Sequence, residues 1–205
     1  MYEGCFRHQL AAFVLCVTLF SGCGKVRYPT NYVLDFPRLA PHASAQQPTL
    51  GAVVVREFRC PQYLCGGRIV FRPSPAEVGF YEFHRWGVDP RESITLFLAN
   101  TLRARSIFTY VASQEGGITA AYILTGSIDR LEEVDRGRAV HVECTIAAQL
   151  VDAETGSVVW SDTASEAVAV QKRNITGVVN SLTAAVQITV ERLVSSMANQ
   201  LLTQH

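Results

Sequence analysis

The chain has 205 residues, with 18 basic and 18 acidic side chains and therefore no formal net charge. This length predicts one domain, and the neutral balance argues against a nucleic-acid-binding protein, which would carry a basic surface. A hydrophobic fraction of 48% with only 18% charged residues argues against a disordered chain. The six cysteines form no Cys-x-x-Cys pair that would indicate a zinc site. These observations indicate a globular domain with a packed core.

An apolar run, Leu10–Phe20, lies close to the N-terminus. A transmembrane helix needs about 20 apolar residues, so this run is too short to span a bilayer and suits the hydrophobic region of a signal peptide. It leads into Leu-Phe-Ser-Gly-Cys at residues 19–23, which resembles a bacterial lipobox. We therefore expect residues 1–22 to be a lipoprotein signal peptide, Cys23 to be lipidated, and residues 23–27 to be a tether. The alternative is a plain secretory signal with a coincidental cysteine.

The residue after Cys23 bears on which membrane the lipoprotein is sorted to. An aspartate there usually means that a bacterial lipoprotein is retained in the inner membrane, and this chain has Gly24 instead. By analogy with that sorting rule, we expect the protein on the periplasmic face of the outer membrane. Each buried methylene of an acyl chain contributes roughly 0.8 kcal/mol of transfer free energy, so several chains on one cysteine would hold the domain firmly.

The first half of the mature chain predicts short strands around one helix. The strands are expected at residues 28–36, 50–58, 68–72, 79–83 and 107–112, with a loop at 37–49 and a turn at 73–75. The helix begins after Asp89, a good N-cap, with Pro90 at its first position. Its apolar stripe follows at helical spacing and consists of Ile94, Phe97, Leu98 and Leu102.

The second half predicts a meander of strands followed by a long helix. Residues 121–131 lead into a charged turn at 132–137, residues 140–150 alternate strictly between apolar and polar, and 157–170 return after a hairpin turn at 152–156. A continuous apolar stripe from Ile175 to Leu201 predicts an amphipathic helix. The expected fold is α+β, a mostly antiparallel sheet with two main helices packed on one face, forming one domain over residues 28–205.

The sequence offers little for catalysis. It has no HExxH, no GxSxG and no cluster of histidine, cysteine and aspartate, so we expect neither an enzyme nor a bound metal or cofactor. Cys60 and Cys65 enclose four residues, and a disulfide is expected because an exported protein enters an oxidising compartment. Two free thiols are the alternative. Cys144 lies on the apolar face of its strand and is expected to be a small buried side chain.

Several segments together resemble a known family. They are Tyr32-Val33-Leu34-Asp35, Pro61 with Tyr63-Leu64, Arg68–Arg72, Tyr81, Arg85-Trp86, Leu124-Thr125-Gly126-x-Ile128, and the hairpin Asp152–Trp160. Their order and spacing closely resemble the ABC-type transport auxiliary lipoprotein family over roughly residues 28–202.

The resemblance implies a non-enzymatic periplasmic lipoprotein. Such a protein would work with an MCE-domain protein and an ABC permease and ATPase to move phospholipids or other hydrophobic molecules between two membranes. Candidate interface residues, chosen because loops, tryptophan and arginine are common at binding hot spots, are Tyr63, Leu64, Arg72, Arg85 and Trp86. Trp86 has a second interpretation, in which it anchors the start of the helix in the core. No nucleic acid is expected as a partner, and homo-oligomerisation is left open.

Two other functions remain alternatives at this point. One is a structural or regulatory outer-membrane lipoprotein that acts in cell-wall synthesis or secretion. The other is direct carriage of a lipid in an apolar pocket.

Overall fold

The computed structural model describes residues 27–39, 50–113, 119–137 and 139–202. Three predicted segments lie wholly or mostly outside these ranges. They are the signal peptide, the tether from Cys23 to residue 26, and the loop at 37–49 from residue 40 onward. The elements in chain order are β1 Thr30–Tyr32, β2 Val53–Val55, α2 Gln62–Cys65, β3 Arg68–Ser74, β4 Glu77–Trp86, α3 Pro90–Arg105, β5 Val111–Ala112, β6 Tyr122–Asp135, β7 Val140–Asp152, β8 Val158–Ala169 and α4 Ile175–Leu202.

The predicted α+β class is confirmed, but the sheet is mixed rather than mostly antiparallel. Strands β6, β7 and β8 form an antiparallel meander, and β3 and β4 form an antiparallel hairpin. The remaining pairs, β1 with β4, β2 with β5, β2 with β6 and β3 with β6, are parallel. The parallel pairings are short and join segments far apart in sequence, so alternation within a strand could not reveal them.

Strand β6 is the centre of the sheet. One edge pairs with β7 over its whole length. The other edge pairs first with β2 at residues 122–124 and later with β3 at residues 133–134. Between these two pairings, Arg59 still follows β6, because its N–H donates to the carbonyl of Gly126 and its carbonyl accepts from Ile128. The chain therefore runs beside β6 twice in the same direction, with a detour at residues 60–67.

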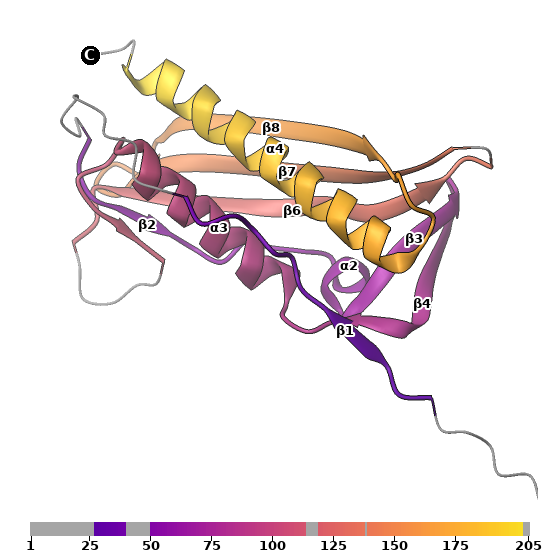
Figure 1. Cartoon of the computed structure of the whole chain (residues 1–205). Helices are drawn as coiled ribbons and strands as arrows, with labels where there is room; N and C mark the ends of the chain where they lie inside the picture. The colour runs from indigo at the N-terminus through magenta and orange to yellow at the C-terminus, as the bar shows by residue number, and fades with distance from the viewer. Residues whose placement is uncertain (1–26, 40–49, 114–118, 138, 203–205) are drawn as a thin grey trace, which may run out of the picture.

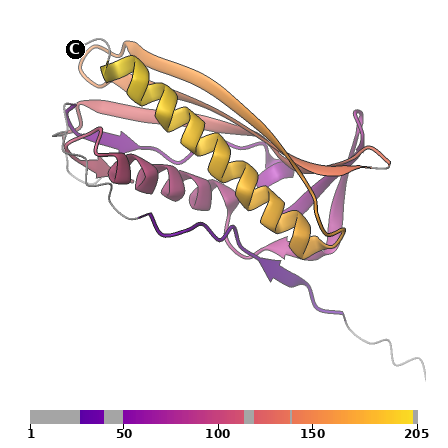
Figure 2. The same ribbon diagram turned by 45° about the horizontal axis from the view of Figure 1, so that its top comes forward.

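The two long helices lie side by side. Figure 1 shows α4 lying across β6, β7 and β8, with α3 next to it, and Figure 2 shows the same neighbours from another angle. Helix α3 begins as expected, because the Asp89 carboxylate accepts from the N–H of Arg91 and Pro90 occupies the first turn. The largest fully buried side chains are Trp160, Phe58, Leu64, Ile69, Ile94, Leu98, Leu102, Leu124, Ile128, Leu131, Ile146 and Leu150. No helix within the described residues is long and apolar enough to cross a membrane.

Helix α4 also protects the edge of the sheet at β8, which within the described ranges pairs with β7 alone. The side chains of Ser181, Arg192 and Gln200 donate to the main-chain carbonyls of residues 169, 165 and 159, at 3.4, 3.1 and 3.4 Å respectively. These outward carbonyls would otherwise be free to accept a strand from another chain. The helix therefore occupies acceptors that strand addition would need.

Several predicted bounds were wrong. The strands expected at 28–36, 50–58 and 107–112 are only two or three residues long, and the β3–β4 turn falls at residues 75–76 rather than 73–75. The charged turn expected at 132–137 is wrong in its first half, because β6 continues to Asp135. Glu132 and Glu133 are therefore strand residues, and both are buried.

The glycine of the Leu-Thr-Gly-x-Ile segment is explained by a close approach. A Cβ at Gly126 would lie 2.5 Å from the carbonyl oxygen of Ala147 and 2.6 Å from the ring of Phe58. Phe58 cannot easily give way, because its ring is buried and its N–H donates to the Thr95 hydroxyl on α3 at 3.1 Å. Only a residue without a side chain fits at this position.

We predict that Gly126→Ala lowers the free energy of unfolding by about 1–3 kcal/mol, the usual cost of overpacking a core. Thermal unfolding of the purified protein measures it. The matched control is Ser127→Ala on the next, partly exposed position, which should change stability by less than about 0.5 kcal/mol. Equal melting temperatures for the two variants would contradict this explanation of Gly126.

Candidate partner interface

The detour at residues 60–67 forms a short loop closed by a disulfide. Cys60 and Cys65 are bonded, with their Cα atoms 6.1 Å apart, and the N–H groups of residues 64 and 65 both donate to the carbonyl of Pro61. Within the loop, Tyr63 is 37% exposed whereas Leu64 is fully buried. Leu64 is thus a core residue, and its expected role as an interface residue is corrected. Tyr63 remains on the surface.

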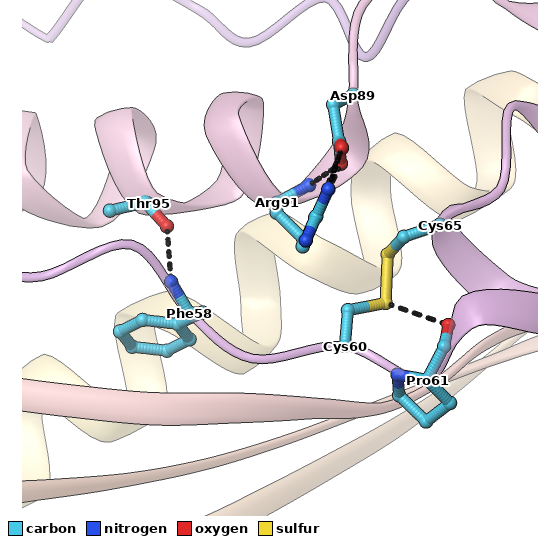
Figure 3. Close-up of a disulfide and its surroundings, with 7 residues drawn as sticks. All are labelled: Phe58, Cys60, Pro61, Cys65, Asp89, Arg91 and Thr95. Carbon is cyan, nitrogen blue, oxygen red and sulfur yellow. Dashed lines mark hydrogen bonds and ion pairs between the residues drawn. A yellow bond between two sulfur atoms is a disulfide. The ribbon is translucent and has the colours of Figure 1, made fainter.

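Figure 3 shows this disulfide together with the residues at the start of α3. Phe58, just before the loop, is joined to α3 by its hydrogen bond to Thr95. The carboxylate of Asp89 binds both the main-chain N–H and the guanidinium of Arg91, and this pairing holds the pKa of Asp89 below its ordinary value. The chain is thus tied to α3 just before the loop, and the disulfide closes the loop itself.

A buried ion pair joins β3 to β6. Arg72 Nε and Nη2 donate to the two carboxylate oxygens of Glu132 at 2.8 and 2.9 Å. The Glu132 side chain is fully buried and that of Arg72 is 18% exposed. The hydrogen bonds to Glu132 raise the pKa of Arg72. Arg72, one of the predicted interface residues, is thus held in place by a buried carboxylate.

Two further arginines and a second glutamate lie next to this ion pair. Arg130 lies 3.9 Å from Glu132 and also bonds to Glu143, and Arg136 approaches Glu143 at 3.5 Å. His141 Nε2 lies 3.0 Å from the same carboxylate. The hydrogen bonds from His141 and Arg130 hold the pKa of Glu143 below its ordinary value, although partial burial opposes this.

We call Arg72, Arg130, Arg136, Glu132 and Glu143 the arginine cluster. It lies on the side of the sheet away from α4, because its β7 member, residue 143, points opposite to Cys144, which is buried against Thr189 of α4. The cluster has three guanidinium groups and two carboxylates, so one positive charge is left uncompensated. The side chains of Arg130 and Arg136 are 51% and 70% exposed. This part of the sheet therefore presents two guanidinium groups to solvent.

Most of this cluster was not predicted from the sequence. Residues 132 and 133 were assigned to a turn, and Glu143 was included only as a polar position in an alternating strand. No alternating pattern marks the end of β6, because Leu131 and Val134 are three residues apart and lie on opposite faces of the strand. Glutamate side chains inside a continuing strand need a partner when they are buried.

On the opposite face of β6, Glu133 is buried beside β4. It accepts a hydrogen bond from the Tyr81 hydroxyl. Burial raises the pKa of Glu133, more than the Tyr81 bond lowers it, and burial likewise raises the pKa of Tyr81. No ion pair to Glu133 is present among the residues that the structure describes. An ionised Glu133 therefore costs folding free energy.

The last two predicted interface residues, Trp86 and Arg85, differ in their exposure to solvent. Trp86 is buried, with 7% exposure, and joins the core where α3 begins, which agrees with its second interpretation. Arg85 is exposed and lies opposite Arg68 in the β3–β4 pairing.

Cys144 is a free, buried thiol as expected, and burial raises its pKa to about 12. No group of three or more metal-ligating side chains is found within the described ranges.

The chain belongs to the family described as the ABC-type transport auxiliary lipoprotein component, whose match covers residues 32–198. The family-level resemblance seen in the sequence is thus confirmed, and the protein is a lipoprotein-family component of an ABC-type transport system. No curated protein matches the chain significantly.

Solved structures support the fold at low sequence identity. Protein XCC0632 from Xanthomonas campestris is 19% identical, with a TM-score of 0.72 over 86% of this chain and 100% of that one. An uncharacterized protein is 14% identical, with a TM-score of 0.61 over 74% of this chain and 96% of that one. The hypothetical protein CT253 from Chlamydia trachomatis is 6% identical, with a TM-score of 0.53 over 74% and 98%.

We predict that Arg72→Ala lowers the free energy of unfolding by roughly 3 kcal/mol, because it leaves the buried Glu132 carboxylate without its bidentate partner. Thermal or denaturant unfolding measures it. The double variant Arg72→Leu/Glu132→Leu removes both charges and should recover most of the loss. Arg105→Ala, on an exposed arginine of α3, is the control. A single variant no less stable than this control would show that the pair does not support the fold.

We predict that Glu133→Gln raises the melting temperature at pH 7.5 by a few degrees. Because the pKa of Glu133 is raised in the folded state, its contribution to stability is greatest below its ordinary value of 4.5 and is lost as the pH rises. Glutamine keeps an acceptor for the Tyr81 hydroxyl without the charge. The gain should therefore shrink as the pH falls toward 4.5, and a pH series of melting curves tests this. Glu154→Gln on an exposed turn is the control, and a gain that does not vary with pH would refute the assignment.

Proposed function

We propose that the protein is a non-enzymatic outer-membrane lipoprotein that acts as the auxiliary component of an ABC/MCE-type intermembrane lipid transport system. Its domain would dock onto an MCE-domain protein, which in turn works with an ABC permease and ATPase. The observation that carries the proposal is the family match over nearly the whole domain. The arginine cluster supports it, because exposed guanidinium groups are suited to recognising a partner rather than to chemistry.

The proposed anchor is a lipid on Cys23. Only six residues separate Cys23 from Thr30, the first residue of β1. Even a fully extended chain spans at most about 3.6 Å per residue, so β1 would start within about 25 Å of the lipidated cysteine. Such a short tether would keep the domain close to the membrane surface. Gly24 favours the outer membrane as that surface.

The proposed docking surface combines the disulfide loop with the arginine cluster. Tyr63 supplies an exposed aromatic ring on a loop whose main chain is fixed by the disulfide. Arg130 and Arg136 supply exposed guanidinium groups, and Arg85 adds another from β4. Aromatic and arginine side chains dominate binding hot spots, and a fixed loop loses little entropy on binding. The excess positive charge favours an acidic surface on the partner.

We predict that the full-length protein co-purifies with the MCE-domain protein encoded beside it. Tyr63→Ala and Arg136→Glu should each reduce the recovered partner about tenfold, the effect of losing one hot-spot contact. Arg105→Glu makes the same charge change on α3 and should leave recovery unchanged. Recovery is measured by pull-down with each tagged, full-length variant after extraction in mild detergent.

Cys23→Ser separates the anchor from the docking surface. This variant should move from the membrane fraction to the soluble fraction and still bind the partner. A variant that stays in the membrane unchanged would contradict the anchor. A wild-type protein and a Cys23→Ser variant that both fail to recover any partner would contradict the MCE proposal itself.

A further inference from the structure

A groove runs along the outer side of α3, on a different surface from the arginine cluster. It lies between α3 and the extended residues 34–39 and has a volume of about 650 Å³. Its apolar lining includes Leu34, Phe36, Leu39, Leu96, Phe97 and Ala104. Its volume falls within the range of small-molecule sites, about 300–1,000 Å³. We call it the α3 groove.

Part of the groove's lining is a well-ordered apolar contact. The rings of Phe36 and Phe97 stack with centroids 4.2 Å apart and planes 14° apart, which fixes residues 34–39 against the helix. Leu96, the residue before Phe97 in the helix, is 48% exposed. It also lines a second hollow of about 430 Å³, together with Val54 and Val55. The two hollows therefore share Leu96 and form one path along α3, which is apolar at Leu96 and more polar beyond it.

The charges along this path are unevenly distributed. Arg38 and Arg103 line the α3 groove, accompanied by one carboxylate, Asp35. In the second hollow the charged lining is Arg56 with two carboxylates, Glu57 and Glu92. An anionic group is therefore favoured in the α3 groove and disfavoured at the other end of the path.

The two arginines lie at the same end of the groove. Figures 1 and 2 both show the indigo N-terminal segment running alongside α3. Starting from the Phe36–Phe97 stack, Arg38 is two extended residues away, about 7 Å. Arg103 is six helical residues away, about 9 Å along the axis. The groove is therefore apolar around the stack and cationic near the end of α3.

Neither of these guanidinium groups is neutralised by an ion pair in the part of the chain that the structure describes. Arg103 donates through Nε and Nη2 to the carbonyl of Val111 at 3.1 and 2.9 Å and through Nη1 to Asn100 at 2.6 Å. These bonds fix its position, and none of their acceptors carries a full negative charge. The partial negative charge at the C-terminus of α3 is offset by Arg103 itself and by Arg105, both in the last turn.

We propose that the α3 groove binds a glycerophospholipid. One acyl chain lies along the apolar lining past Leu96, and the phosphate sits beside Arg38 and Arg103. The inference rests on one part of the proposed function, namely that the transported material is lipid. It gives the auxiliary protein a direct contact with that lipid, on a surface that the partner docking described above does not use.

The test uses the full-length protein in cells. A photoreactive benzoylphenylalanine replaces Leu96, and the same probe replaces Val158, which is 55% exposed at the start of β8, as the matched control. Cells are labelled with ³²P phosphate and irradiated, and the protein is purified under denaturing conditions. The diacylglycerol on a lipoprotein cysteine has no phosphate, so ³²P on the protein reports captured phospholipid and not the protein's own anchor.

We expect ³²P capture at position 96 to exceed capture at position 158 about tenfold. Arg38→Glu, on an exposed side chain, should reduce capture at position 96 by a similar factor, because it removes one phosphate contact and adds a repulsive charge. The melting temperature of each variant checks that the fold is kept, and Arg38→Gln serves as a milder second variant. Equal capture at the two positions, or capture at 96 unaffected by both Arg38 variants, would overturn the proposal. Because partner pull-down is measured separately, a failed groove and a failed docking surface give different results.

Discussion

The pairing of the outer edge of β6 determines most of the structure. Strand β7 pairs with one edge of β6 throughout, whereas the other edge is covered by two separate segments, β2 with its continuation to Arg59 and then β3. Both segments run parallel to β6, but the register changes by six residues between Arg59 opposite Ser127 and Phe71 opposite Glu133, so the extra residues loop out of the edge at residues 60–67. The disulfide loop fills that detour, and the return places Arg72 beside the buried Glu132. The loop and the arginine cluster are thus consequences of one topological constraint.

The domain presents two surfaces of different character. On the side of the sheet away from α4, the arginine cluster offers fixed charges suited to a protein partner. Alongside α3, the stacked rings and the two arginines form an amphipathic groove suited to a lipid. At the β8 edge, α4 occupies the main-chain carbonyls that another strand would need. A short tether to Cys23 would hold both surfaces near a membrane, as an auxiliary transport component requires.

The sequence predicted what depends on local pattern. The capped start of α3, the alternating β7 and the amphipathic α4 all followed from residues that are neighbours in sequence or recur at a fixed period. The parallel pairings of β2 and β3 did not, because their partners lie about 60–70 residues further along the chain. The same limit hid the site: Glu132 looked like part of a surface turn, and only its long-range contact with Arg72 explains its burial. Leu64 and Tyr63 could not be told apart for a similar reason, since the loop's orientation decides which side chain is buried.

Hydrogen exchange of the full-length protein with and without its MCE-domain partner tests the central claim most directly. Docking through the loop and the arginine cluster predicts slower exchange in residues 60–67 and at the turn between β6 and β7, with little change in the turn between β7 and β8. Slower exchange confined to the β7–β8 turn or to α4, with none in residues 60–67, would contradict the account.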